Sequence, residues 1–166
     1  MIPVSPASSA SLPQSPAVPD PEGPSRGAVS VGIVLVSHSR ALAEAAVDLA
    51  RRLIVAVDVP VEKAAGLADG GLGTDPGAVV EAVERLGERC EGVLVLADLG
   101  SGVMSAEMAL EMLDPALAER TRLSAAPFVE GLLGAYGAAG IGKDLQAVAA
   151  EADGAAEAKR SQMAAF

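Results

Sequence analysis

His38 is the single histidine of this 166-residue chain, and its position makes it the first candidate for chemistry. It follows the apolar run Val31 to Val36, which is typical of a strand buried on both faces, and a helical pattern begins at Ala41. Ligand sites of open parallel sheets form where such strands end. An imidazole in that position can act as a nucleophile at neutral pH. We therefore expect His38 to be the reacting residue.

Asp98 is the best-placed carboxylate to orient that imidazole. It follows another continuously apolar run, Val93 to Ala97, and is expected at the carboxyl end of a second buried strand. A carboxylate that accepts a hydrogen bond from one ring nitrogen fixes the tautomer and leaves the other nitrogen to attack. No acyl-transfer nucleophile is evident, because Ser37 and His38 should point to opposite faces of an extended chain. The electrophile that suits this pair is phosphoryl.

A glycine-rich loop could receive the anionic group. Gly70, Gly71 and Gly73 precede Asp75, a typical N-cap, and Pro76, a typical first helical residue. Backbone N–H groups near Gly71 and Gly73, with the Thr74 hydroxyl, could bind an anion there. The loop lacks the Gly-Lys-Ser/Thr of a P-loop and the dinucleotide fingerprint. Taken alone, this loop is weak evidence for an anion site, since such loops are often only tight turns.

The elements that must position these residues alternate between strands and helices. We expect strands at 31–36, at 53–57 continued by 61–65, at 93–97 and at 122–126, and helices at 40–52, from 76, after 101, from 127 and from about 143. This order predicts an α/β fold with a doubly wound, mainly parallel four-stranded sheet and helices on both faces. With strand order 2-1-3-4, His38, Asp98 and the glycine loop converge at the switch point between strands one and three.

Three side-chain patterns refine the helices. Ser101 is expected to cap the helix that follows Asp98. Met104, Met108 and Met112 recur along that helix and are interpreted as core residues. Gly131, Gly134, Gly137 and Gly140 recur every third residue of a later helix. This predicts that its backbone approaches a neighbour closely, because glycine otherwise destabilises a helix.

Composition narrows the function classes. The net charge of −10 and the 2% aromatic content argue against nucleic-acid and anionic-membrane binding. The one cysteine, Cys90, fits a reducing cytosol, and with one histidine it makes a zinc site improbable. No apolar run is long enough to span a membrane and no secretory signal is recognised, so a cytoplasmic location is expected. Residues 1–27 are rich in proline and serine and predict a disordered extension before a domain at 28–160.

Four segments, which follow one another in the same order as in a known family, carry a resemblance to it. They are Val36-Ser37-His38-Ser39, Gly71 to Asp75, Asp98 to Ser101 and Ala125 to Gly131. Across residues 29–150 the chain resembles mannose-type phosphotransferase-system (PTS) IIA domains. It resembles more closely the phosphotransferase subunit of phosphoenolpyruvate-dependent dihydroxyacetone kinase. The resemblance implies that HPr phosphorylates the histidine, and that the phosphoryl group then passes to ADP on a partner subunit, which phosphorylates dihydroxyacetone.

The resemblance also implies residue roles. His38 matches the phosphorylated histidine, so the phosphoryl group is carried covalently without a bound cofactor or metal. Asp98 matches the orienting carboxylate. Gly71, Gly73 and Thr74 match the loop beside the phosphohistidine, and Ser39 joins them as a phosphoryl-binding candidate. The family implies a homodimer, and a separate HPr is expected because no HPr-like or enzyme I-like domain follows before Phe166.

Some questions stay open at this point. Arg40 is either a phosphate contact or a solvated helix start. The acidic helix around residues 81–88 is a candidate partner surface. A mannose-type sugar-transport IIA component is one alternative function, although the Ala125-to-Gly131 segment favours the kinase subunit. A non-catalytic regulatory or nucleotide-binding module is another, although the glycine loop has no lysine or arginine for nucleotide phosphates.

Overall fold

The structure is a computed structural model that describes residues 30–55 and 58–164. In chain order, its elements are β1 (Val31–Ser37), α1 (Arg40–Leu53), β2 (Val61–Ala65), α2 (Pro76–Gly87), β3 (Gly92–Ala97), α3 (Gly100–Met112), α4 (Pro115–Ala118), β4 (Thr121–Ser124), α5 (Phe128–Gly140) and α6 (Leu145–Ala164). The predicted extension at 1–27 lies outside the described residues. None of the helices in the described ranges is both long and apolar enough to cross a bilayer.

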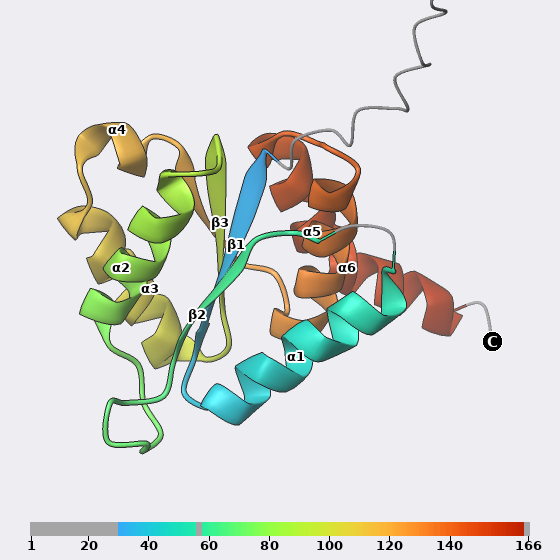
Figure 1. Cartoon of the computed structure of the whole chain (residues 1–166). Coiled ribbons are helices and arrows are strands. Elements are labelled where there is room, and N and C mark those ends of the chain that lie inside the picture. Colours follow the sequence, from blue (N-terminus) through green and yellow to red (C-terminus); the bar gives the residue numbers. More distant parts are fainter. Residues whose placement is uncertain (1–29, 56–57, 165–166) are drawn as a thin grey trace, which may run out of the picture.

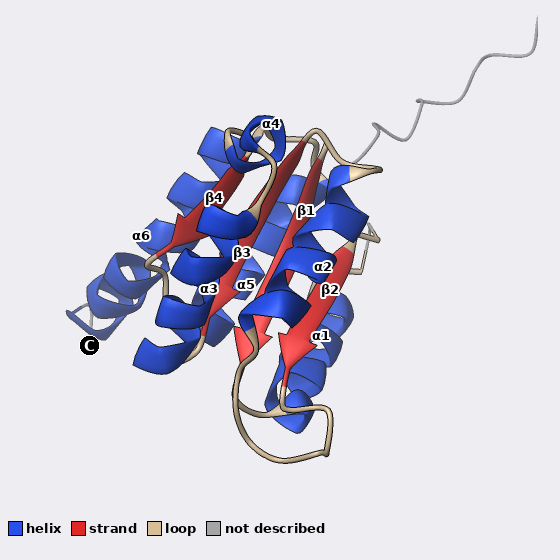
Figure 2. Ribbon diagram, turned by 90° about the vertical axis from the view of Figure 1, so that its left-hand side faces the viewer, coloured by secondary structure: helices blue, strands red, loops and turns tan. Residues whose placement is uncertain are grey.

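The four strands form one parallel sheet in the order β2-β1-β3-β4, which confirms the predicted topology. Helices α1, α5 and α6 cover one face, and α2 and α3 cover the other (Figures 1 and 2). The central strand β1 supplies both cores, because alternate residues point to opposite faces. Ile33 and Leu35 enter the core under α1, α5 and α6, whereas Val34 and Val36 enter the core under α2 and α3.

The register places the carboxyl ends of three strands at one edge. Val36 of β1 pairs with Ala64 of β2 and with Ala97 of β3. The segments that follow these strands therefore leave the sheet side by side. In Figure 2 the loop from β2 to α2 extends beyond the arrowheads of the strands at this edge. This edge is where the sequence places the candidate residues.

The strand predicted at 53–57 is wrong over its described part. Leu53 is the last residue of α1, and Ile54 caps the helix through its backbone N–H, which donates to Ala50 O. Val55 lies in a turn, and residues 56 and 57 lie outside the described part, so β2 consists of Val61–Ala65 alone. Ile54 packs on the core as the end of a helix. A short apolar run does not distinguish a helix end from a strand.

The fourth strand and the last helices differ from their predictions mainly in their limits. The strand is Thr121–Ser124, three residues after the unpredicted short helix α4, and it ends two residues earlier than expected. Ser124 Oγ accepts a hydrogen bond from the Ala126 backbone N–H at 3.1 Å, so the chain already turns there. Helix α6 continues to Ala164, beyond the predicted domain boundary at 160.

The methionines of α3 are not core residues, contrary to the prediction. Met104, Met108 and Met112 are 63%, 54% and 61% exposed. The buried face of α3 consists of the small residues Gly102, Ser105, Ala106 and Ala109. Small side chains let α3 lie close to the sheet and α2, which leaves the long methionine side chains outside.

The glycine prediction for α5 is confirmed at two positions. A Cβ atom on Gly134 would lie 2.8 Å from the Glu151 carbonyl oxygen of α6, and one on Gly131 would lie 2.6 Å from the Ala126 Cβ. A Cβ on Gly137 would meet only the Ile54 side chain at an ordinary 3.7 Å. The small residues of α5 thus allow close packing against α6 at Gly134 and against the preceding turn at Gly131.

Candidate active site at the carboxyl edge of the sheet

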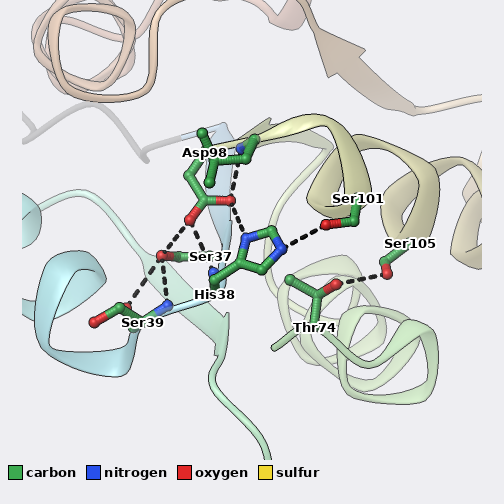
Figure 3. A network of polar contacts seen from close by, with 8 residues as sticks. Ser37, His38, Ser39, Thr74, Asp98, Ser101 and Ser105 are labelled. Atoms are coloured by element: carbon green, nitrogen blue, oxygen red, sulfur yellow. Dashed lines mark hydrogen bonds and ion pairs between the residues drawn. The ribbon is translucent and has the colours of Figure 1, made fainter. Parts of the chain in front are cut away.

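The structure brings His38, Asp98 and the start of α3 together. His38 is the first residue after β1, Asp98 is the first after β3, and these two strands are paired in register up to Val36 and Ala97. Ser101 lies in the first turn of α3. Figure 3 shows the imidazole ring between the Asp98 carboxylate and the Ser101 hydroxyl. Parallel strand pairing therefore converts a separation of 60 residues into direct contact.

Asp98 holds both the ring and the backbone of His38. Its Oδ1 lies 2.9 Å from His38 Nδ1, and its Oδ2 accepts the His38 backbone N–H at 2.8 Å. Oδ2 also accepts the Ser37 hydroxyl at 2.9 Å, and Oδ1 accepts the Leu99 backbone N–H at 2.7 Å. The Asp98 side chain is only 5% exposed, whereas that of His38 is 24% exposed. The carboxylate is buried, whereas the imidazole ring, the candidate nucleophile, is partly exposed.

The Asp98 carboxylate is stabilised in its charged form. Burial raises its pKa, but hydrogen bonds from the His38 backbone and ring, the Ser37 hydroxyl and the Leu99 backbone outweigh burial and hold the pKa below the usual value. Asp98 is therefore an acceptor at neutral pH, and His38 Nδ1 must be the donor in the neutral ring.

This tautomer makes Nε2 the nitrogen with the free electron pair. Ser101 Oγ lies 2.5 Å from Nε2, so the serine hydroxyl donates to it. The prediction that Ser101 caps α3 is wrong. Leu99 occupies the N-cap position without a side-chain hydrogen bond, and Ser101 is the second helical residue. The hydroxyl that was expected to cap a helix contacts the candidate nucleophile instead.

Two further residues of the site were missed in the sequence. Ser37 is fully buried, and its hydroxyl, which contacts Asp98, also accepts the Ser39 backbone N–H at 3.1 Å. A polar residue at the end of an otherwise apolar buried strand was the available signal. Gly102 allows α3 to approach the pair, because a Cβ there would lie 3.0 Å from Asp98 Oδ1. The bond from Ser37 to Asp98 agrees with the expectation that Ser37 and His38 form no dyad.

The glycine loop lies beside the main chain of His38, with its predicted donors already bonded. Gly73 N–H donates to His38 O at 3.0 Å, and Gly71 N–H donates to Asp69 Oδ1 at 2.8 Å. Thr74 Oγ1 lies 2.8 Å from Ser105 Oγ of α3, below the ring in Figure 3. The loop is therefore hydrogen-bonded both to the residue after β1 and to α3. Anion binding by Gly71, Gly73 and Thr74 remains a prediction.

Ser39 and Arg40 stand at the start of α1. Ser39 is the N-cap, and its hydroxyl accepts the Leu42 backbone N–H at 3.3 Å, so its predicted phosphoryl contact would compete with a helix cap. Arg40 is exposed and lines a hollow of about 670 Å³ together with Lys63 and Thr74. Within residues 30–55 and 58–164, no three His, Cys, Asp or Glu side chains gather as a metal site would require. The chemistry that the arrangement offers is nucleophilic attack by one oriented imidazole nitrogen.

The chain is similar to known proteins over most of its described length. The family model EIIA-man, described as PTS system fructose IIA component, matches residues 32–149. The phosphoryl donor subunits DhaM of PEP-dependent dihydroxyacetone kinase from Klebsiella michiganensis and Escherichia coli are each 43% identical over 135 residues. This match includes 80% of the chain and 28% of each relative, so the chain spans just over a quarter of their length.

A shorter relative and two solved structures are also similar to this chain. The phosphoryl donor subunit DhaM of dihydroxyacetone kinase 2 from Listeria innocua is 36% identical over 61% of the chain and 79% of its own length. The crystal structure of EF1359, a protein described as of unknown function, is 32% identical with a TM-score of 0.70, covering 76% of this chain and 95% of that one. A sigma-54 interaction domain protein from Enterococcus faecalis shares the fold at 17% identity and a TM-score of 0.58, over 84% of this chain and 98% of its own. With a family model matched across the sheet and the His38 edge, the chain belongs to the EIIA-man family of PTS IIA components.

Proposed function

We propose that this chain is the phosphoryl-carrying part of a phosphoenolpyruvate-dependent dihydroxyacetone kinase, with the phosphoryl group carried on His38. The observation that carries the proposal is the ring geometry. Asp98 accepts from Nδ1, Nε2 is the ring nitrogen without the proton, and the His38 side chain is 24% exposed. The 43% identity to phosphoryl donor subunits over 80% of the chain supports the choice of kinase.

The proposed reaction needs no cofactor on this chain. The Nε2 electron pair attacks the phosphorus of phospho-HPr, a new N–P bond forms, and the N–P bond to the HPr histidine breaks. The electron pair of that bond stays on the leaving imidazole. The proton on His38 Nδ1 remains in place, and the Asp98 carboxylate stabilises the positive charge that develops on the ring. The Ser101 hydroxyl leaves the Nε2 electron pair and becomes available to a phosphoryl oxygen.

The second transfer reverses this chemistry toward a different acceptor. ADP held on the nucleotide subunit of the kinase attacks the phosphoryl group of His38 and leaves the neutral imidazole. In this scheme the chain is a carrier within a phosphotransferase system and not itself the catalyst of the kinase reaction. We further propose that it acts in the cytoplasm, as a homodimer, with HPr and the ADP-binding subunit as its partners. Sedimentation equilibrium tests the dimer, whose mass would be twice that of the 16.5 kDa chain.

The experiment that tests the proposal is a reconstituted reaction. Phosphoenolpyruvate, enzyme I, HPr, this chain, the ADP-loaded nucleotide subunit and the dihydroxyacetone-binding subunit are combined, and dihydroxyacetone phosphate is measured. We expect product with the wild-type chain and none with His38→Ala. Phosphorylation of His38 without product would instead favour a sugar-transport component of the same family. A regulatory domain that only binds a ligand would show neither.

A further inference from the structure

The exposed face of α3 carries an apolar stripe that begins at the reacting nitrogen. Met104, Met108 and Met112 repeat every four residues, and each is more than half exposed. Ser101, three residues before Met104, belongs to the same face, because residues three and four apart are neighbours on a helix. Its hydroxyl is the group at 2.5 Å from His38 Nε2. The eleven residue steps from Ser101 to Met112, at 1.5 Å each, make this methionine stripe with its first serine about 16 Å long.

The surroundings of the stripe are acidic. Glu107 and Glu111 are exposed on α3, each three residues after a methionine of the stripe. Neither forms an ion pair within residues 30–55 and 58–164, and α3 contains no lysine or arginine. A second copy docked on this face would bring the same carboxylates together without a cation on α3. Charge complementarity therefore favours a partner with basic residues around an apolar centre.

We propose that the methionine stripe, with Glu107 and Glu111, is the docking surface for the phosphoryl donor HPr, and that HPr meets it with a basic, apolar-centred face. This inference rests on the proposed function. A donor must bring its phosphorus to Nε2 and so must cover Ser101, from which the stripe extends. Methionine suits a contact that forms and dissociates in each cycle, because its flexible side chain adapts to a partner surface. Attraction between Glu107 and Glu111 and a basic face of HPr would offset the repulsion between the phosphoryl group and a chain of net charge −10.

The test is the initial rate of His38 phosphorylation over a range of phospho-HPr concentrations. We expect Met108→Lys to raise the KM at least about tenfold, which corresponds to about 1.4 kcal/mol of lost contact, with kcat nearly unchanged. The matched control is Ile141→Lys, which is expected to leave KM unchanged. Ile141 is 74% exposed, and it lies beyond α5 at the other end of the sheet, where Ser30 Oγ, just before β1, bonds to Lys143 O.

Charge reversal provides an independent arm. We expect the double variant Glu107→Lys with Glu111→Lys to raise the KM at least as strongly, and the wild-type KM to rise with salt. The control reverses an exposed carboxylate of α2 and that of its exposed C-cap residue, Glu84→Lys with Glu88→Lys. A larger effect of these α2 changes than of the α3 changes would overturn the proposal in favour of the acidic α2 face.

Three other outcomes would also overturn it. The first is a wild-type KM for Met108→Lys. The second is a change of oligomeric mass in that variant, which would make the stripe a contact between copies. The third is that the variant slows only the onward transfer to the ADP-loaded subunit. If the wild-type chain accepts no phosphoryl group from HPr, the proposed function fails and this inference fails with it. Circular dichroism and thermal unfolding of each variant exclude a folding defect as the cause.

Discussion

At the scale of single residues, the reactivity of His38 depends on which nitrogen holds the proton. The Asp98 carboxylate accepts four hydrogen bonds, two at each oxygen, and only an ionised carboxylate can accept at both oxygens without a proton of its own. This acceptor holds the proton on Nδ1 and leaves Nε2 free to attack. The position next to the end of β1 brings the ring to the site, and in the proposed transfer the carboxylate decides which nitrogen reacts.

Replacing Asp98 by asparagine should therefore affect chemistry more than folding. The asparagine amide has only one oxygen, so its NH₂ group would face two of the four donors that bond to the Asp98 carboxylate. If the NH₂ group faces the ring, His38 favours the tautomer with the proton on Nε2, which cannot attack. We expect Asp98→Asn to slow phosphorylation by HPr by at least about 100-fold, as for other imidazoles that lose an orienting carboxylate. Rapid-quench measurements with intact-mass detection give the rate.

The control for this variant is Asp48→Asn, which removes a carboxylate from an exposed pair with Arg52 on α1. It is expected to leave the rate unchanged. A wild-type rate for Asp98→Asn would show that the carboxylate does not orient the reacting ring. Loss of the folded state in Asp98→Asn would instead give Asp98 a structural role.

The lowered pKa of the Asp98 carboxyl predicts that the stability of the fold depends on pH. Its pKa is lowered in the folded state, so as pH falls the unfolded chain takes up the Asp98 proton before the folded chain does. The contribution of Asp98 is complete above its unfolded pKa of about 3.9 and is lost as pH falls through the folded value. We expect the difference in unfolding free energy between wild type and Asp98→Asn to shrink as pH falls below about 4. Urea denaturation measures it, and a difference that grows in acid would contradict the assignment.

At the scale of elements, the packing of α5 on α6 depends on a glycine. A Cβ on Gly134 would lie 2.8 Å from a backbone oxygen of α6, which cannot move away as a flexible side chain could. We expect Gly134→Ala to destabilise the fold by about 1–3 kcal/mol, the usual cost of overpacking. The matched change is Gly154→Ala in α6, where a Cβ would meet nothing within 4 Å. That change should stabilise by about 1 kcal/mol or less, because alanine favours a helix. Equal thermal shifts in the two variants would refute the close contact.

The centre of the sheet was predictable because β1 and β3 are short, continuously apolar runs separated by helical patterns. The convergence of His38 with Asp98 followed from strand order and needed no side-chain detail. The faces of the helices were less predictable. The methionines of α3 have a core-like spacing, but Gly102, Ser105, Ala106 and Ala109 give a closer approach and take the buried face. The roles of Ser37 and Ser101 depend on contacts across 61 and 63 residues of sequence, which local patterns do not encode.

At the scale of the whole molecule, the described core draws on a defined stretch of the chain. Its buried residues run from Val31 to Ala152 and form one cluster on each face of the sheet. We expect a chain that begins at Ala28 to unfold at the same temperature as the full chain and to be phosphorylated by HPr at the same rate. Scanning calorimetry and the phosphorylation assay compare the two. A lower unfolding temperature or a slower rate would assign residues 1–27 a part in the domain.

The central claim, that His38 carries a phosphoryl group on Nε2, is tested most directly by one phosphorylation experiment on the whole protein, read out in two ways. The chain is incubated with phosphoenolpyruvate, enzyme I and HPr, its intact mass is recorded, and the imidazole nitrogens are observed by ¹⁵N NMR. We predict the gain of one acid-labile phosphoryl group, its absence in His38→Ala, and a phosphorus coupling at Nε2 with the proton retained on Nδ1. A phosphoryl group on Nδ1, or on a residue other than His38, would contradict the account, as would no gain of mass with active HPr.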